Sequence, residues 1–272
     1  MASFYRAVTP PSAGWQNSRM ETSVPMRDMR IPRLFYPGEI SPGSLLDLPD
    51  AAAHHALRVL RLRPGERVAL FNGAGGEWSG QIAEIHKARV AVQVHAHRAR
   101  DVESPLTIVL AQAISTRERM ELTMQKAVEL GVSEIQPLGS RRSVVKLNEE
   151  RASRRVEHWQ NLVISACEQC GRNRVPLVHP IEELSAWLAA LPKTHADTRL
   201  MLAPQASLRL RELPAPRGVL LLVGPEGGLD AEERELAELF GFTGVQLGPR
   251  VLRTETAALA AVSAMHALWG DF

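Results

Sequence analysis

The sequence predicts an α/β protein in two parts, a small β-barrel followed by a parallel α/β sheet. Two observations predict this division. Short strand-like runs separated by Gly- and Pro-rich turns fill the region from about residue 30 to 100. After Pro105 strands alternate with longer helical patterns, which is typical of a parallel sheet. With 272 residues, 45% of them hydrophobic, the chain is long enough for two domains of moderate size.

Residues 29–101 are expected to form the β-barrel domain. The predicted strands are Arg67–Phe71, Trp78–Ile85 and Arg89–Val94. Turn sequences such as Arg63–Glu66 separate them. One short helix is predicted at Asp50–Leu60, and Asp101–Pro105 is the predicted linker to the second part.

Residues 105–272 are expected to form the parallel α/β domain. The predicted strands are Leu106–Gln112, Glu134–Leu138, Arg199–Leu202, Gly218–Val223 and Gly244–Leu247. The predicted helices are Arg117–Leu130, Glu149–Cys170, Ile181–Ala190, Asp230–Phe240 and Thr254–Trp269. The polar loop Ser140–Asn148 carries Arg141, Arg142 and Lys146.

Several protein classes are excluded by the segments that the chain lacks. Residues 1–28 are rich in Pro, Ser and Met and have no apolar stretch of the signal-peptide kind, so we expect a disordered tail or an extended start before Met29. No apolar run approaches the roughly 20 residues of a membrane span. The two cysteines, Cys167 and Cys170, make no disulfide framework, which favours a cytoplasmic protein.

Basic residues are concentrated in the first part of the chain. Residues 30–100 hold ten Lys or Arg against six Asp or Glu, whereas residues 101–272 hold nineteen against twenty-two. The barrel is therefore the part that favours an acidic partner. Of the 32 basic residues 28 are Arg, which suits phosphate contacts, although a GC-rich genome accounts for the same bias.

The loop Gly224–Gly228 follows the apolar predicted strand Gly218–Val223. It precedes the predicted helix Asp230–Phe240, whose first turn is acidic. Ligands bind at the carboxyl ends of strands in open α/β sheets, and glycines allow the backbone to approach them closely. The loop has neither a phosphate-loop Lys nor a dinucleotide fingerprint. Acidic residues at the helix start disfavour a polyphosphate, so a cationic or neutral nucleoside fits better. A purely structural turn is the alternative.

The segment Leu247–Ala257 also joins a strand to a helix. Thr254 is the predicted N-cap of that helix. Two such loops at adjacent strand ends would form one pocket, and Arg250 and Arg253 lie beside it without an obvious partner. A simple capped helix is the alternative.

A third motif, Ala166–Pro176, ends a helix. Its Cys-x-x-Cys pair has no second pair to complete a zinc site and does not open a helix, so metal and redox roles are disfavoured. Glu168, Arg172 and Arg174 lie at or just past the helix end, where polar groups can face a substrate.

These motifs together resemble the SPOUT methyltransferase superfamily, and within it the family that methylates N3 of a uridine in 16S ribosomal RNA. The resemblance runs from Met29 to the C-terminus, with its motifs in the correct order. They are Gly224–Gly228, Leu247–Ala257, Glu168–Arg172, Met29–Arg33, His54–Arg61, Gln125–Val132 and Val144–Lys146.

The resemblance implies a PUA-like, RNA-binding barrel and a SPOUT domain with a deep C-terminal trefoil knot. The knot is expected from the loops after Leu202, Val223 and Leu247, which would hold S-adenosylmethionine. The implied enzyme is a homodimer that acts on the 30S subunit and needs no metal. The implied cofactor-binding residues are Leu202, Pro204, Val223, Gly224, Pro225, Glu226, Gly227, Leu247, Gly248, Leu252, Thr254 and Ala257.

Methylation of uracil at N3 requires a group that stabilises the uracil anion. Neutral uracil keeps a proton on N3, and a cation near O2 and O4 stabilises the anion that forms when it leaves. Arg172 and Arg253 are the candidates for that role, and Glu168 is the candidate base or orienting group. The candidate RNA contacts are Arg30, Arg33, Arg58, Arg61, Arg141, Arg142 and Lys146; each taken singly is better explained as a solvated surface charge, and only together do they favour RNA.

Three alternatives remain open at this point. A SPOUT enzyme could instead methylate a ribose 2′-hydroxyl or a guanine of another RNA. A non-catalytic ribosome assembly factor could keep the pocket and lack the activity. A nucleotide-binding oxidoreductase is disfavoured because the dinucleotide fingerprint is missing.

Overall fold

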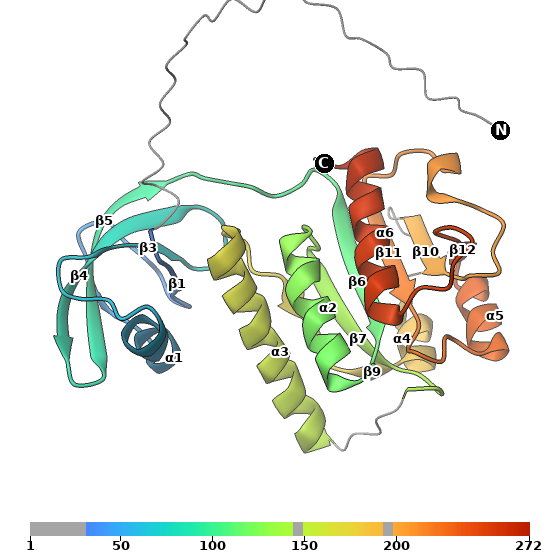
Figure 1. Ribbon diagram of the computed structural model, residues 1–272, viewed down its shortest axis with the longest axis horizontal. Helices are drawn as coiled ribbons and strands as arrows, with labels where there is room; N and C mark the ends of the chain where they lie inside the picture. Colours follow the sequence, from blue (N-terminus) through green and yellow to red (C-terminus); the bar gives the residue numbers. More distant parts are fainter. Residues whose placement is uncertain (1–30, 144–148, 193–197) are drawn as a thin grey trace, which may run out of the picture. The chain divides into compact units, whose positions relative to one another are not determined.

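The computed structural model describes residues 31–143, 149–192 and 198–272 (Figure 1). Within it, Pro32–Phe272 forms one compact unit that contains two sheets. The predictions for the N-terminal tail, for Arg30 and for Lys146 fall outside the described residues.

The N-terminal sheet has five strands in the order β1-β3-β4-β5-β2. Their bounds are β1 Arg33–Phe35, β2 Leu45–Asp47, β3 Arg67–Phe71, β4 Glu77–His86 and β5 Arg89–Arg98. β1 pairs with β3 in parallel, and the other pairs are antiparallel. The predicted β3, β4 and β5 are confirmed, whereas β1 and β2 were not predicted. The predicted helix is also present, as α1 (Asp50–His54) followed by the π-helical turn η2 (His55–Val59).

The C-terminal sheet is parallel, as predicted, and runs in the order β12-β10-β11-β6-β7-β8, with β9 also paired to β7. The strands are β6 Thr107–Ala113, β7 Glu134–Gly139, β8 Leu177–Val178, β9 Glu182–Glu183, β10 Thr198–Leu202, β11 Gly218–Val223 and β12 Thr243–Val245. The five predicted strands are confirmed within one to two residues. β8 and β9 were missed.

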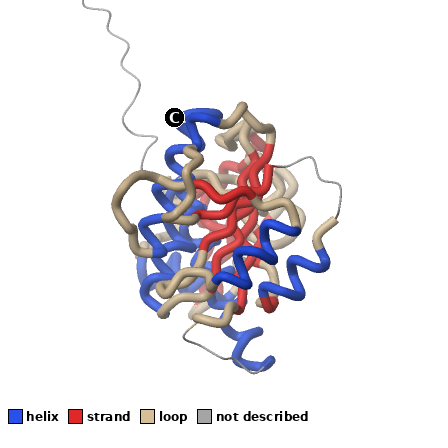
Figure 2. Tube along the Cα trace, turned by 90° about the vertical axis from the view of Figure 1, so that its right-hand side faces the viewer, coloured by secondary structure: helices blue, strands red, loops and turns tan. Residues whose placement is uncertain are grey.

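Helices cover both faces of this sheet (Figures 1 and 2). The first face packs against α2 (Arg117–Glu129), α3 (Glu149–Cys170) and α6 (Thr254–Trp269), and the second against α4 (Leu184–Ala190) and α5 (Ala231–Leu239). A short 3-10 helix, η3 (Leu210–Glu212), follows β10. Successive strand residues alternate between the two cores, as Leu221 and Leu222 do, which explains why β11 is apolar throughout.

Two helix starts differ in how they are capped. Asp230 caps α5 through a reciprocal pair of hydrogen bonds with Glu233, which accounts for the acidic first turn. The prediction that Thr254 caps α6 is wrong. Arg253 occupies the cap position, and the Thr254 hydroxyl instead donates to the Gly224 carbonyl at 2.6 Å. α4 begins at Leu184 rather than at Ile181, because Glu182–Glu183 pairs with β7 first.

Candidate functional site

A cavity of about 310 Å³ lies at the carboxyl ends of β10, β11 and β12, and the loops that follow these three strands line it. Its volume lies at the lower end of the range for small-molecule sites, roughly 300–1,000 Å³. All twelve residues predicted from the sequence to bind the cofactor line this cavity. They come from three loops that are far apart in the chain, and the parallel sheet brings the loops together because its strand ends share one edge.

The Gly224–Gly228 loop forms one wall of the cavity as a tight turn. The Gly228 N–H donates to the Pro225 carbonyl at 2.9 Å, and Gly228 has a φ of +67°, which favours glycine. A Cβ on Gly224 would lie 2.9 Å from the Leu229 nitrogen, so a side chain there would force the turn open. The glycines therefore fix the shape of the wall.

A buried polar chain ties this wall to the loop before α6. Thr254 is the link, because its hydroxyl donates to Gly224 and accepts from the Gln112 amide nitrogen at 3.0 Å. Gln112 is 1% exposed and lies near the end of β6. Breaking this chain would leave buried polar groups unpaired, so it holds the two loops at a set spacing.

Glu226 places a negative charge at the edge of the cavity. One carboxylate oxygen accepts from the Thr116 N–H at 2.9 Å and lies 3.2 Å from an Arg119 guanidinium nitrogen. Burial by itself raises the pKa of Glu226, but the hydrogen bonds and Arg119 outweigh it and lower this pKa below its usual value. The carboxylate is therefore ionised at neutral pH.

Ten further described residues line the cavity beyond the twelve predicted ones. Among them are Arg142, Gln205, Arg234, Arg250 and Val251. Two of the arginines support loops: Arg142 donates to the Gly227 carbonyl at 2.8 Å, and Arg234 donates to the Leu229 carbonyl at 2.7 Å. No local sequence signal points to the contact of Arg142, because its partner Gly227 lies 85 positions away in the chain, whereas Arg234 and Leu229 are only five positions apart.

The three candidate catalytic residues do not meet in this chain. Arg253 is exposed and lies between the lining residues Leu252 and Thr254. Neither Arg172 nor Glu168 is among the described residues that line the cavity. The catalytic roles of all three stay predictions, and the structure gives only Arg253 a position beside the pocket.

Arg172 and Glu168 have other partners. Arg172 is 5% exposed, forms an ion pair with Glu103 and donates to the Val128 and Val132 carbonyls at 2.9 and 2.8 Å. Glu168 accepts from the Phe35 N–H of β1 at 3.0 Å. Burial raises the pKa of Glu168, against the opposing effects of that N–H, His55 and Arg33.

The candidate RNA contacts are divided between surface and interior. Arg58 and Arg61 are exposed at η2 and just after it. Arg33, by contrast, is buried in an ion pair with Glu77. Arg141 is exposed but pairs with Asp230 and Glu232, and Arg142 lies on the cavity wall. Of the positions that the structure describes, the η2 pair fits a phosphate contact best.

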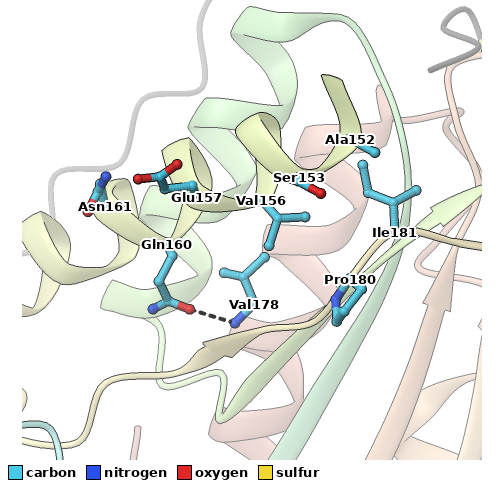
Figure 3. Close-up of a pocket in the computed structure, with 9 residues that line it drawn as sticks. All are labelled: Ala152, Ser153, Val156, Glu157, Gln160, Asn161, Val178, Pro180 and Ile181. Atoms are coloured by element: carbon cyan, nitrogen blue, oxygen red, sulfur yellow. Dashed lines mark hydrogen bonds between the residues drawn. The ribbon is translucent and has the colours of Figure 1, made fainter. Parts of the chain in front are cut away.

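A larger hollow of about 700 Å³ lies between α3 and the segment 178–181 (Figure 3). Gln160 extends from α3 toward Val178 and accepts from the Val178 N–H at 2.9 Å. Among the nine described residues that line it, Glu157 alone is ionisable. Despite its size, this hollow lacks a cluster of groups that could carry chemistry.

Other chemistry finds little support in the part of the chain that the structure describes. No group of three His, Cys, Asp or Glu is placed to hold a metal ion there. Both cysteines are free thiols, and burial raises the pKa of Cys167 to about 12, so this thiol is unreactive. No helix in residues 31–143, 149–192 and 198–272 is long and apolar enough to cross a membrane.

Comparison with known proteins finds two matching family models. An RNA methyltransferase domain matches residues 102–266, and an RNA methyltransferase PUA domain matches residues 48–94. The chain is 34% identical over 243 residues to a ribosomal RNA small subunit methyltransferase E from Buchnera aphidicola, with 89% of this chain and 98% of the relative covered. The namesake from Bacillus subtilis is 31% identical, with 84% and 91% covered.

Two solved structures are also similar. A methyltransferase from Legionella pneumophila, in complex with the bound cofactor SAM, superposes with a TM-score of 0.86 at 43% identity, covering 89% of this chain and all of that one. A ribosomal RNA small subunit methyltransferase E from Neisseria gonorrhoeae, bound to S-adenosylmethionine, gives 0.83 at 44% identity, covering 89% and 99%.

Proposed function

Because this chain belongs to the ribosomal RNA small subunit methyltransferase E family, we propose that it methylates N3 of one uridine in 16S ribosomal RNA, within the 30S subunit. The chain is an S-adenosylmethionine-dependent rRNA methyltransferase. One structural observation supports the proposal at the cofactor site. Every residue that the family resemblance assigned to the cofactor lines the same cavity at the carboxyl edge of the parallel sheet.

The cavity fits this cofactor in size and in its mixed apolar and polar lining. Leu202, Val223 and Leu247 provide apolar lining, and the backbones of three loops provide N–H and C=O groups at close range. The charged residues among the described lining are Glu226, Arg142, Arg234 and Arg250, so the lining carries both signs. When bound, S-adenosylmethionine would supply an electrophilic methyl group on its sulfonium.

The residues of this chain have two tasks in the transfer. The N3–H of uracil must lose its proton, which would pass to solvent water, so that N3 can accept the methyl group that the bound cofactor would supply. Arg253, exposed at the start of α6 beside the cavity, is proposed to stabilise the negative charge that spreads over O2 and O4. Holding both reactants in line supplies up to roughly 7–11 kcal/mol in well-oriented systems.

Three structural features belong to the same proposal. Residues 29–101, the predicted domain that holds the N-terminal sheet, are proposed as the RNA-binding domain and residues 105–272 as the methyltransferase domain. The segments after Leu202, Val223 and Leu247 are proposed to form the trefoil knot, and two copies of the chain to form a homodimer. The proposal places the enzyme in the cytoplasm, where ribosomal subunits are assembled.

The experiment that tests the proposal is nucleoside mass spectrometry of 16S RNA. Unmethylated 30S subunits are incubated with the enzyme and isotope-labelled S-adenosylmethionine, and then digested to nucleosides. We expect the label in 3-methyluridine alone. Label in a 2′-O-methylated nucleoside or in methylguanosine would overturn the assignment. Cofactor binding without any label would favour the assembly-factor alternative.

A further inference from the structure

The end of α3 contacts the N-terminal sheet rather than the cavity. We call residues 168–175 the α3 exit. Its backbone pairs with the loop after β3: the Gly75 N–H donates to the Asn173 carbonyl at 3.2 Å, and the Val175 N–H donates to the Gly73 carbonyl at 3.3 Å. The Phe35 N–H of β1 adds a third bond, to Glu168. Gly73 has a φ of +88°, and a Cβ there would lie 3.3 Å from Val175, so only glycine allows this approach.

Arg33 is the central side chain of this contact. One guanidinium nitrogen lies 2.5 Å from Glu77, and another donates to the Arg172 carbonyl at 3.1 Å and to the Asn173 side-chain oxygen at 2.5 Å. The guanidinium also lies 4.9 Å from the centre of the Phe71 ring. The side chains of Arg33 and Glu77 are each 11% exposed, so the pair is largely withdrawn from water.

The segment between the two sheets is held by the same residues. Arg172 pairs with Glu103, and the Asn173 amide donates to the Arg100 carbonyl at 2.9 Å. Arg100 in turn donates to the Gly171 carbonyl at 3.3 Å. The predicted linker Asp101–Pro105 is therefore held at Glu103, and at Asp101 through its ion pair with Arg174, and Arg100, the residue before it, is held as well.

A shared apolar core completes the contact. Phe71 of β3 is fully buried in the same cluster as Ile108 and Leu110 of β6, and Phe35 packs against that cluster. Interfaces between domains of one chain are usually polar and permit relative motion. Here a buried ion pair, a backbone pairing and a common core act together, which favours a fixed orientation.

We propose that the α3 exit is a rigid joint that orients the RNA-binding sheet relative to the methyl-donor cavity. In this proposal, which rests on the proposed function, Arg33, Glu168, Arg172 and Asn173 are positioning residues that do not touch the reacting atoms. A large folded RNA is recognised by shape, so its target base reaches the cavity only if sheet and cavity keep a set geometry. A misplacement of about 1 Å at a reacting centre costs up to 10²-fold in rate.

The test compares Glu168→Ala with Glu168→Gln. A glutamine oxygen still accepts from the Phe35 N–H, but a glutamine cannot take up a proton. The matched control is Glu157→Ala, at an exposed position of the same helix. The readouts are kcat/KM for 30S subunits, the calorimetric Kd of S-adenosylmethionine, and hydrogen exchange of the peptides that span β1 and residues 73–75, all measured well below each variant's Tm.

We expect Glu168→Ala to lower kcat/KM for the 30S subunit roughly tenfold or more. Its cofactor Kd should be unchanged, and β1 should exchange faster. Glu168→Gln should restore both kcat/KM and protection, and Glu157→Ala should match the wild type. A glutamine variant as inactive as the alanine one would make Glu168 the base and overturn the proposal. A folded alanine variant with normal exchange and normal kcat/KM would overturn it too.

The exchange readout is independent of the proposed function. If the wild type fails to methylate 30S subunits, the uridine assignment fails. The joint is still tested by the protection of β1 in the three variants. If Glu168→Ala lost as much cofactor affinity as it lost kcat/KM, Glu168 would act by holding the cavity in shape. That result would overturn its role in orienting the N-terminal sheet.

Discussion

The cavity and the α3 exit are both rich in arginine, but they use it differently. At the α3 exit, Arg33 and Arg172 are buried and paired with carboxylates. At the cavity, Arg250 and Arg253 are exposed on a loop, while Arg142 and Arg234 donate to loop carbonyls. The difference teaches that a charged motif next to a helix end does not by itself mark a reaction site. Burial and partners decide between holding the fold and meeting a ligand.

The strongest way to break this comparison is to remove one half of the buried pair. Arg33→Leu should lower the free energy of unfolding by about 3 kcal/mol, because the buried Glu77 keeps only the longer ion pair with the half-exposed Arg100, and the Arg172 carbonyl and the Asn173 side chain lose their donor. The matched control is Arg154→Leu, whose ion pair with Glu150 is exposed, with an expected loss below about 1 kcal/mol. Urea unfolding measures both. Equal losses in the two variants would show that the α3 exit is not a buried polar contact.

The next largest effect is expected in the cavity. Gly227→Val should weaken S-adenosylmethionine binding by about 100-fold, equal to about 2.7 kcal/mol. A Cβ at this position would already lie 3.3 Å from Arg142, and the branched side chain would enter the cavity. Calorimetry measures the affinity, and an unchanged Tm shows that the fold is kept. Normal affinity would remove this loop from the cofactor site.

Arg253→Ala should lower kcat by about 10- to 100-fold without changing the cofactor Kd. The reason is that the arginine is proposed to stabilise charge that develops only during the transfer. Single-turnover methylation of 30S subunits measures the effect. Arg211→Ala, on η3, serves as the surface control. A variant with a higher KM and an unchanged kcat would make Arg253 an RNA contact instead.

The smallest expected effect concerns pH and the α3 exit. Burial raises the pKa of Glu168, so the folded protein holds this proton at pH values where the unfolded chain has released it. Between the usual pKa of a glutamate and the raised one, stability therefore falls as pH rises. Glu168→Gln should lack this part of the pH dependence. Urea unfolding across that pH range checks it, and an identical profile in wild type and variant would contradict it.

The sequence allowed most of the fold to be predicted, because long elements carry their own periodicity. The bounds of α3 and α6 were predicted to the residue. β1 and β2 have three residues each and β8 and β9 two, too few for any alternation to show. The individual residues of the cavity lining followed from the family resemblance, while the glycine-rich loop after β11 by itself indicated only a turn at a strand end.

The partners of the polar side chains could not be predicted. Arg33 and Arg172 lie 139 positions apart, and nothing local in either segment indicates that they meet. The same limit explains Thr254, which has the composition of a helix cap but bonds to Gly224, 30 positions away. Such long-range hydrogen bonds hold an arginine side chain inside the protein, and an arginine held there cannot contact RNA.

The separation of cofactor binding from orientation is tested most directly by calorimetric titration of S-adenosylmethionine into three proteins. They are the wild type, Gly227→Val and Glu168→Ala. The account predicts that Gly227→Val alone loses affinity, by about 100-fold, while Glu168→Ala binds as the wild type does. Wild-type affinity in Gly227→Val, or an equal loss in both variants, would contradict it.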